Sequence, residues 1–470
     1  MTERRSGKLN AAAQRIGCRF LHTGIVLALS IAPAFGAGGL DPKLEALLRS
    51  MSPAKEVSVI VTLQEKEDLI PFRNKDKGKS RALLIRALQA RAEATQKPLR
   101  AFLEKGGARN VQTLWSINGL MATARVDVIR GLAKIPGVGD VRPDYEYGIS
   151  ARPVTGAPAT IPAWNLKSIG ATALWEQGVT GDGVVVANLD TGVDIHHADL
   201  RDRWRGGTNS WYDTSGRYKT PVDVNGHGTQ AMGVIVGGNE GGIPIGIAPG
   251  ARWIAVKVFD DRGRTSIGRY HLGFQWLLDP DGDPATDDAP DAVSFSWGFD
   301  KQVNQCITEF HDDIRVLRAA HIAVVFAAGN GGPGASTSVS PANHRESLSC
   351  GAVNESLDVS AFSSRGPSAC DGGIFPQLVA PGDGIRTADL TAGGAFRQVY
   401  AMVQGTSFAA AHVAGAMALL VSAFPKATLE EIEEALIKSA VDRGKAGPDN
   451  DYGYGLVNLQ GAYTVLLRKD

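Results

Sequence analysis

The sequence has little of what several protein classes need. Its 470 residues include 4 cysteines, too few for a fold held together by disulfides. Lys and Arg together number 49, as do Asp and Glu, so the basic excess typical of nucleic-acid-binding surfaces is missing. Beyond the N-terminal region, we expect no segment long enough to span a membrane. Hydrophobic residues at 43% and charged residues at 21% are typical of a globular protein, and the balanced charge leads us to expect no nucleic-acid partner.

The N-terminus has the pattern of an export signal. A basic head precedes the apolar stretch Leu21 to Ala34, and Ala34-Phe35-Gly36 offers small residues at the positions that a signal peptidase reads. The alternative, a transmembrane anchor, needs about 20 apolar residues, and this stretch is shorter. We therefore expect residues 1–37 to be a signal peptide. The remainder would be secreted, periplasmic or extracellular, with no membrane partner after signal removal.

The segment 38–153 carries the pattern of a small separate domain. Strands are expected at 57–63, 111–115, 120–126 and 138–147, and helices at 80–104 and 128–135. Pro98 should kink or divide the longer helix. The order β-α-β-β-α-β predicts a ferredoxin-like α+β domain. Residues 148–163 are rich in Pro, Ala, Gly and Thr and form the expected linker.

The segment 154–470 alternates short apolar runs with helical stretches. The runs are 184–189, 253–258, 292–295, 322–327 and 348–353, and the helices are expected at 226–236, 266–278, 307–320, 406–423 and 429–440. Short runs rich in Val, Ile and Ala are typical of strands buried on both faces of a parallel sheet. The alternation predicts a doubly wound, mostly parallel α/β sheet.

Three polar clusters of this segment contain the groups of a nucleophilic hydrolase. Asp190 ends an apolar strand, His227 lies between two glycines, and Ser407 opens a small-residue helix after a Gly turn. Each alone is explained by a turn or a helix cap. Together they supply a Ser nucleophile, a His base and a carboxylate that orients the imidazole. The order Asp, His, Ser excludes the α/β-hydrolase order.

A fourth cluster, Ala327-Ala-Gly-Asn330, ends another apolar strand. The Asn330 amide could donate to a developing oxyanion beside the backbone N–H of Ser407. The alternative is a turn, because Asn330-Gly331-Gly332 also suits turn geometry.

With these blocks in this order, residues 164–463 resemble the subtilisin-like serine peptidases, or subtilases, and most closely the bacillopeptidase F-like group. The landmarks are Asn188-Leu-Asp190-Thr-Gly192, Gly226-His-Gly-Thr229 and Gly405-Thr-Ser407. The resemblance implies a secreted serine endopeptidase with polypeptide substrates, with Asp190, His227 and Ser407 as the triad and Asn330 as the oxyanion donor. It also implies that 38–153 is an inhibitory propeptide of an autoprocessed zymogen.

The resemblance places substrate on two cleft walls, Ser296-Trp297-Gly298 and Ala328-Gly329. No acidic residue is evident there, which favours a medium or large apolar substrate side chain. Where the family usually has Met and Pro after the serine, this chain has Phe408 and Ala411. We expect altered rates from these departures, not inactivity.

The chemistry implied by the resemblance requires no cofactor, but a structural metal is an open question. Asp279, Asp281, Asp283 and Asp287 form a dense oxygen cluster around Gly282. Such a loop binds calcium or is simply solvated. Cys306 and Cys370 lie in polar loops, and the sequence leaves open whether they pair, whereas Cys350 is expected to be a buried thiol.

Two other functions use the same residues. The first is a pseudo-enzyme that binds peptides without cutting them, against which the intact triad argues. The second is an esterase, which cleavage of an unstructured protein distinguishes from a peptidase.

Overall fold

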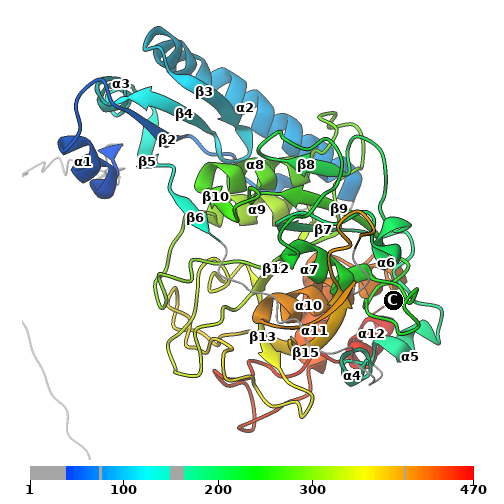
Figure 1. Ribbon diagram of the computed structural model, residues 1–470. Coiled ribbons are helices and arrows are strands. Elements are labelled where there is room, and N and C mark those ends of the chain that lie inside the picture. The colour runs from blue at the N-terminus through cyan, green and yellow to red at the C-terminus, as the bar shows by residue number, and fades with distance from the viewer. Residues whose placement is uncertain (1–38, 73–76, 149–162, 396–398, 470) are drawn as a thin grey trace, which may run out of the picture. The chain divides into compact units, whose positions relative to one another are not determined.

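The computed structural model describes residues 39–72, 77–148, 163–395 and 399–469, and Gly38–Asp470 form one compact unit (Figure 1). The predicted signal peptide and residues 149–162 of the predicted linker lie outside the described residues.

The N-terminal segment folds around a five-stranded sheet of order β1-β5-β2-β4-β3. Its elements are β1 (Gly39–Leu40), α1 (Pro42–Arg49), β2 (Glu56–Leu63), the 3-10 turn η1 (Ile70–Phe72), α2 (Lys77–Lys105), β3 (Arg109–Leu114), the 3-10 turn η2 (Trp115–Ile117), β4 (Gly119–Arg125), α3 (Val126–Leu132) and β5 (Val138–Pro143). The β2-α2-β3-β4-α3-β5 order is the predicted one, with β1 added parallel to β5.

Of the two expectations for Pro98, division of the long helix is wrong, because α2 is one helix of 29 residues with Pro98 inside it. Leu99 and Leu103, directly after the proline, are buried against the small sheet. This packing holds the chain helical where the proline removes one backbone hydrogen bond.

The larger sheet has seven strands, and every neighbouring pair is parallel. Its order is β14 (Leu378–Pro381), β13 (Leu348–Val353), β12 (Ala323–Ala327), β11 (Ala292–Phe295), β7 (Val185–Asp190), β9 (Arg252–Lys257) and β8 (Trp211–Asp213). The predicted doubly wound α/β fold is confirmed. All five predicted apolar runs are strands of this sheet, and β8 and β14 were not expected.

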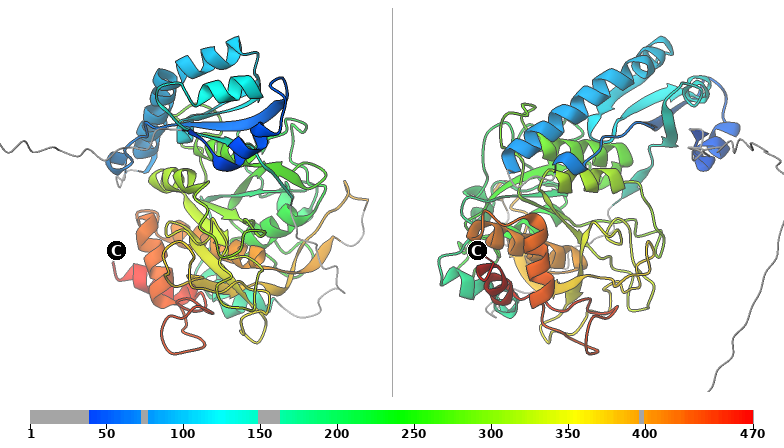
Figure 2. Two further views of the ribbon diagram at one scale, coloured as in Figure 1. Left: turned by 90° about the vertical axis from the view of Figure 1, so that its left-hand side faces the viewer. Right: turned by 180° about the vertical axis from the view of Figure 1, so that it is seen from behind.

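Helices cover both faces of this sheet (Figure 2). On one face lie α7 (His227–Val236), α10 (Thr406–Ala423) and α11 (Leu429–Ser439), and on the other α8 (Ile267–Leu278) and α9 (His311–Ala319). Each face of the sheet has its own hydrophobic core. Consecutive residues of β7 contribute to these two cores alternately, since Val186 belongs to the first and Ala187 to the second. Further elements are α4 (Trp164–Ser168), α5 (Ala171–Trp175), α6 (Ala198–Arg201), α12 (Leu459–Leu467) and the hairpin of β15 (Asp383–Ala388) and β16 (Tyr400–Gln404).

One helix differs from the expectation about membrane-spanning segments. Helix α10 is long and apolar enough to cross a membrane by length and composition, but 83% of it is buried inside the protein. Its apolar residues therefore form part of the hydrophobic core that packs against the large sheet.

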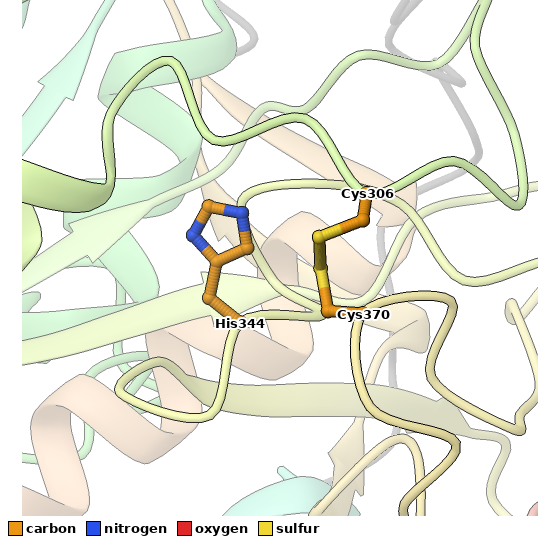
Figure 3. A group of neighbouring side chains, drawn as sticks. All are labelled: Cys306, His344 and Cys370. Carbon is orange, nitrogen blue, oxygen red and sulfur yellow. A yellow bond between two sulfur atoms is a disulfide. The ribbon is translucent and has the colours of Figure 1, made fainter. Parts of the chain in front are cut away.

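Cys306 and Cys370 form a disulfide that closes 64 residues of sequence, beside the ring of His344 (Figure 3). Cys350, on β13, is a buried free thiol, and burial raises its pKa well above the usual value. The structure thus answers the pairing question that the sequence left open.

Candidate active site

Asp190 and His227 meet in the interior. Asp190 is the last residue of β7, and His227 is the first residue of α7. The Nδ1 atom of His227 lies 2.8 Å from Oδ1 and 3.0 Å from Oδ2 of Asp190, and both side chains are almost fully buried. The carboxylate therefore holds the proton on Nδ1 and leaves Nε2 as the ring nitrogen able to accept one.

The turn that presents His227 is shaped by a carboxylate that the sequence reading missed. Asp223 accepts hydrogen bonds from the backbone N–H groups of Asn225, Gly226 and Thr229 and from the Thr229 hydroxyl. Gly228 is required for a steric reason, because a Cβ there would lie 2.2 Å from the carbonyl oxygen of Gly192. This close approach brings the start of α7 onto the end of β7.

Ser407 lies in the first turn of α10, after Gly405, whose φ of 146° favours glycine. Its hydroxyl donates to the carbonyl oxygen of Ser296 over 3.2 Å, and the Ser296 hydroxyl donates to the carbonyl of Ser407, also over 3.2 Å. Nε2 of His227 is buried and has no hydrogen-bond partner among the described residues. The Ser–His hydrogen bond is thus not formed here, as is common in substrate-free sites.

Asn330 is fixed at the end of β12 by the residue before Ser407. The N–H and the hydroxyl of Thr406 both donate to Oδ1 of Asn330, each over 3.0 Å. The Thr406 hydroxyl in turn accepts from the N–H of Gly329 at 3.1 Å. Because Oδ1 is occupied as an acceptor, Nδ2 of Asn330 is the atom available to donate. Asn330 and Ser407 line the same cavity.

The protonated form of His227 is favoured by its surroundings. Burial acts against the charged ring, but the adjacent Asp190, with a smaller contribution from Asp223, outweighs it and raises the pKa. The ring of Phe408, 5.9 Å away between centroids, packs against the imidazole. Phe408 thus covers the histidine at a position where the family usually has Met.

The cavity at Ser407 has a volume of about 440 Å³, and its walls are partly as expected. Ser296, Trp297 and Gly298 line it, as does Val339. Ala328 and Gly329 are buried behind the wall, and the next residues, Asn330 and Gly331, line the cavity instead.

The expectation of a cleft without an acid is wrong, because Asp300 lines this cavity together with the aromatic rings of Phe259, Tyr270 and Phe299. Partial loss of contact with water raises the pKa of the Asp300 carboxyl to about 6. The loop that carries Asp300 lies outside the motifs, so the sequence offered no signal for it.

A strand from the N-terminal segment reaches the same cavity. Strand β6 (Glu146–Gly148) pairs antiparallel with β10 (Arg264–Ser266), and all three of its residues line the cavity. The ring of Tyr147 packs edge-on against Phe299, with centroids 5.4 Å apart. The sequence predicted β6 only as the end of a longer strand.

The acidic loop after α8 brings together part of the predicted metal set. Carboxylate oxygens of Asp279, Asp281 and Asp288 lie within 4.8 Å of one another. Asp283 instead accepts the N–H of Ala285 in its own loop, and Asp287 pairs with Arg81 of α2. Asp288 was not among the expected ligands.

Comparison with known proteins identifies the family of this chain. A profile described as the Subtilase family matches residues 181–455, which contain all four candidate catalytic residues. The chain belongs to the subtilase family. The predicted fold class and enzyme class, a serine endopeptidase of this family, are thereby confirmed at the level of the family.

Two relatives from Bacillus subtilis (strain 168) show how far the similarity extends. The chain is 32% identical to bacillopeptidase F over 423 residues, which is 82% of this chain and 29% of bacillopeptidase F. It is 31% identical to subtilisin E over 364 residues, 76% of this chain and 84% of subtilisin E. Other subtilase relatives are named as a minor extracellular protease and as a major intracellular serine protease. Their names therefore do not decide where this subtilase acts.

Proposed function

We propose that this subtilase hydrolyses peptide bonds with Ser407 as nucleophile, His227 as base and Asp190 as the group that orients the imidazole. The observation that carries the proposal is the buried contact between His227 Nδ1 and Asp190 Oδ1 at 2.8 Å. Because Asp190 engages Nδ1, Nε2 is the ring nitrogen that can accept the serine proton.

The reaction begins when the Ser407 hydroxyl leaves the carbonyl of Ser296 and donates to Nε2 of His227. As Oγ attacks the peptide carbonyl, its proton passes to Nε2, and Asp190 stabilises the imidazolium. Nδ2 of Asn330 and the backbone N–H of Ser407 donate to the carbonyl oxygen as it becomes negative. The imidazolium then protonates the leaving amine, and water repeats the sequence on the acyl-enzyme. No step needs a cofactor.

The substrate is an extended polypeptide. Strand β10 already pairs with an added strand, β6, so a peptide can take the same hydrogen bonds. We propose that Ser296, Trp297 and Gly298 form one wall, with the main chain of Ala328 and Gly329 supporting the other. The aromatic residues of the cavity suit a medium or large apolar side chain, and Asp300 offers a partner to a basic one.

Residues 38–153 serve, in this proposal, as an inhibitory propeptide of the peptidase domain 154–470. Support comes from β6, which occupies the substrate edge of β10, and from the ion pair between Arg142 and Glu309. Arg142 belongs to β5 of the small sheet, and Glu309 precedes α9. The first cut, made by Ser407 within or just before residues 147–160, would free the cleft.

We propose that the chain is exported through residues 1–37 and acts outside the cytoplasm. The disulfide between Cys306 and Cys370 supports this, since such bonds persist in oxidising compartments.

The catalytic proposal is tested with Ser407→Ala and a matched control, Ser422→Ala, on the same helix. Ser422 bonds the carbonyl of Asp182 and lies outside the cavity, so its loss should leave the rate unchanged. Ser407→Ala should cut an unstructured protein at least 10³-fold more slowly, because nucleophile loss in a subtilisin costs about 10⁶ in kcat. Equal rates for the two variants would reject Ser407 as the nucleophile.

The same pair of variants tests zymogen processing. Purified Ser407→Ala should keep residues 38–470 in one chain, whereas Ser422→Ala should release the N-terminal segment. Rapid cleavage of purified Ser407→Ala without another protease would rule out self-processing. Hydrolysis of small esters without cleavage of casein would favour the esterase alternative, and failure of both would favour a peptide-binding pseudo-enzyme.

A further inference from the structure

Three carboxylates converge in the loop that follows α8, and one of them is buried without enough partners. Ligand oxygens of Asp279, Asp281 and Asp288 lie within 4.8 Å of one another. Asp279 is only 7% exposed, and its Oδ1 atom has no hydrogen-bond partner among the described residues. An unpartnered buried carboxylate oxygen is unfavourable, and a bound cation would relieve this cost.

The neighbouring groups satisfy other atoms of the cluster. Asn209 donates to Oδ2 of Asp288 at 3.0 Å, and the Thr286 hydroxyl donates to the carboxylate of Asp281. Gln89, from α2, donates to Oδ2 of Asp279 at 3.4 Å. Arg205 donates to the main-chain carbonyl of Asp288 and not to its carboxylate. Three carboxylates therefore share a small volume, with the guanidinium of Arg205 near Asp288 and Asp281 and that of Arg81 near Asp288.

We propose that Asp279, Asp281 and Asp288 bind a divalent cation of the calcium class. Carboxylate oxygens are the ligands that calcium prefers, and calcium tolerates an irregular shell completed by main-chain carbonyls and water. Gly282, with a φ of 80°, makes the turn that returns the loop toward Asp279. Asp281 is exposed, which leaves one side of the site open to solvent and to an entering ion.

The cation would stabilise the surface on which α2 rests. The almost fully buried Arg81 donates to Asp287 at 2.6 Å and to the carbonyl of Ala320 at 3.0 Å, and Lys77 pairs with Asp291. Asp287 adjoins Asp288, so an ion that fixes the loop also fixes a partner of the helix. This role does not depend on catalysis by Ser407.

Calcium binding is tested on the full chain carrying Ser407→Ala, which prevents self-digestion. This parent is compared with versions that add Asp288→Asn or, as the matched control, Asp283→Asn from the same loop. After chelation and dialysis, calorimetric titration should find one calcium ion fewer per chain with Asp288→Asn than with the parent or the control. Counting the difference separates this site from any other calcium bound by the chain.

Terbium luminescence provides a local readout at the same site. Trp276 lies three residues before Asp279, and its carbonyl accepts the Asp279 N–H at 3.2 Å. Excitation of tryptophan should therefore produce terbium emission that calcium displaces. The emission should fall at least 10-fold with Asp288→Asn and persist with Asp283→Asn.

A second variant, Asp281→Asn, guards against a folding defect, because the Asp281 side chain is exposed. It should lose the same calcium ion while keeping the parent's circular dichroism spectrum. Equal calcium stoichiometry and equal terbium emission in the parent, Asp281→Asn and Asp288→Asn would overturn the proposal.

Discussion

Thr406 donates both its N–H and its hydroxyl to Oδ1 of Asn330, each over 3.0 Å. The residue before the candidate nucleophile thus sets the orientation of the candidate oxyanion donor. Thr406→Val keeps the shape and the N–H but loses the hydroxyl. One neutral hydrogen bond is worth about 0.5–1.5 kcal/mol, so kcat should fall about 2- to 10-fold with KM unchanged. Steady-state kinetics check this, and Thr406→Ser should restore the rate.

Asn330→Ala should remove the side-chain donor itself. We expect kcat to fall by about 10²–10³, the range known for one such donor in a subtilisin, with little change in KM. A raised KM with unchanged kcat would mean that Asn330 only shapes the cavity.

Asp190→Asn should change both the rate and its pH dependence. Burial disfavours the charged His227 ring, and Asp190 more than offsets this, so its pKa is raised. Without the carboxylate the imidazole pKa should fall, and the acidic limb of the kcat/KM profile should move to lower pH. The maximal rate should drop by about 10⁴, since the tautomer is no longer held. An acidic limb that stays in place would show that another group titrates there.

A buried histidine at the contact with the small sheet should make stability depend on pH. Burial opposes charge on His271, but Asp313 at 2.8 Å and Glu309 at 3.0 Å raise its pKa from 6.5 to about 9. Arg142 also donates to the Glu309 carboxylate. Stability from a raised pKa is complete below pH 6.5 and is lost as pH rises toward 9.

Urea unfolding of the Ser407→Ala chain checks this expectation. The midpoint should decrease between pH 6.5 and 9, and His271→Gln should be less stable at pH 6.5 with a flatter pH dependence. Parallel curves for the two proteins would contradict the assignment to His271.

The disulfide gives a prediction about stability. Replacing Cys306 and Cys370 together by Ser frees 64 residues of chain in the unfolded state. The free energy of unfolding should fall by about 2–4 kcal/mol. Thermal unfolding measures the loss, and Cys350→Ala serves as the control for a buried thiol outside the bridge.

The sequence was sufficient for the parts of the site that follow strand ends. Asp190 and Asn330 come directly after apolar runs, and His227 and Ser407 come after glycines that start helices, so local patterns located them. The family resemblance added their order and roles. The assignment of these roles stays a prediction until the variants are measured.

The sequence was insufficient to predict residues whose role depends on contacts with distant parts of the chain. Thr406 acts through Asn330, 76 positions earlier in the chain, and nothing in the local pattern around Asp300 distinguishes it from an ordinary loop residue. The predicted metal ligands show the same limit. Asp287 forms an ion pair with Arg81, 206 positions earlier, and Asp288 instead lies beside Asp279. Spacing alone could not choose between adjacent aspartates.

The most direct test of the central claim is to locate the adduct that a fluorophosphonate forms with the processed enzyme. Digestion and tandem mass spectrometry should find one phosphonylated residue, Ser407, with complete loss of peptidase activity at one adduct per chain. His227→Ala should abolish the labelling, because the hydroxyl then has no base. Labelling at another serine, or full activity after complete labelling of Ser407, would contradict the account.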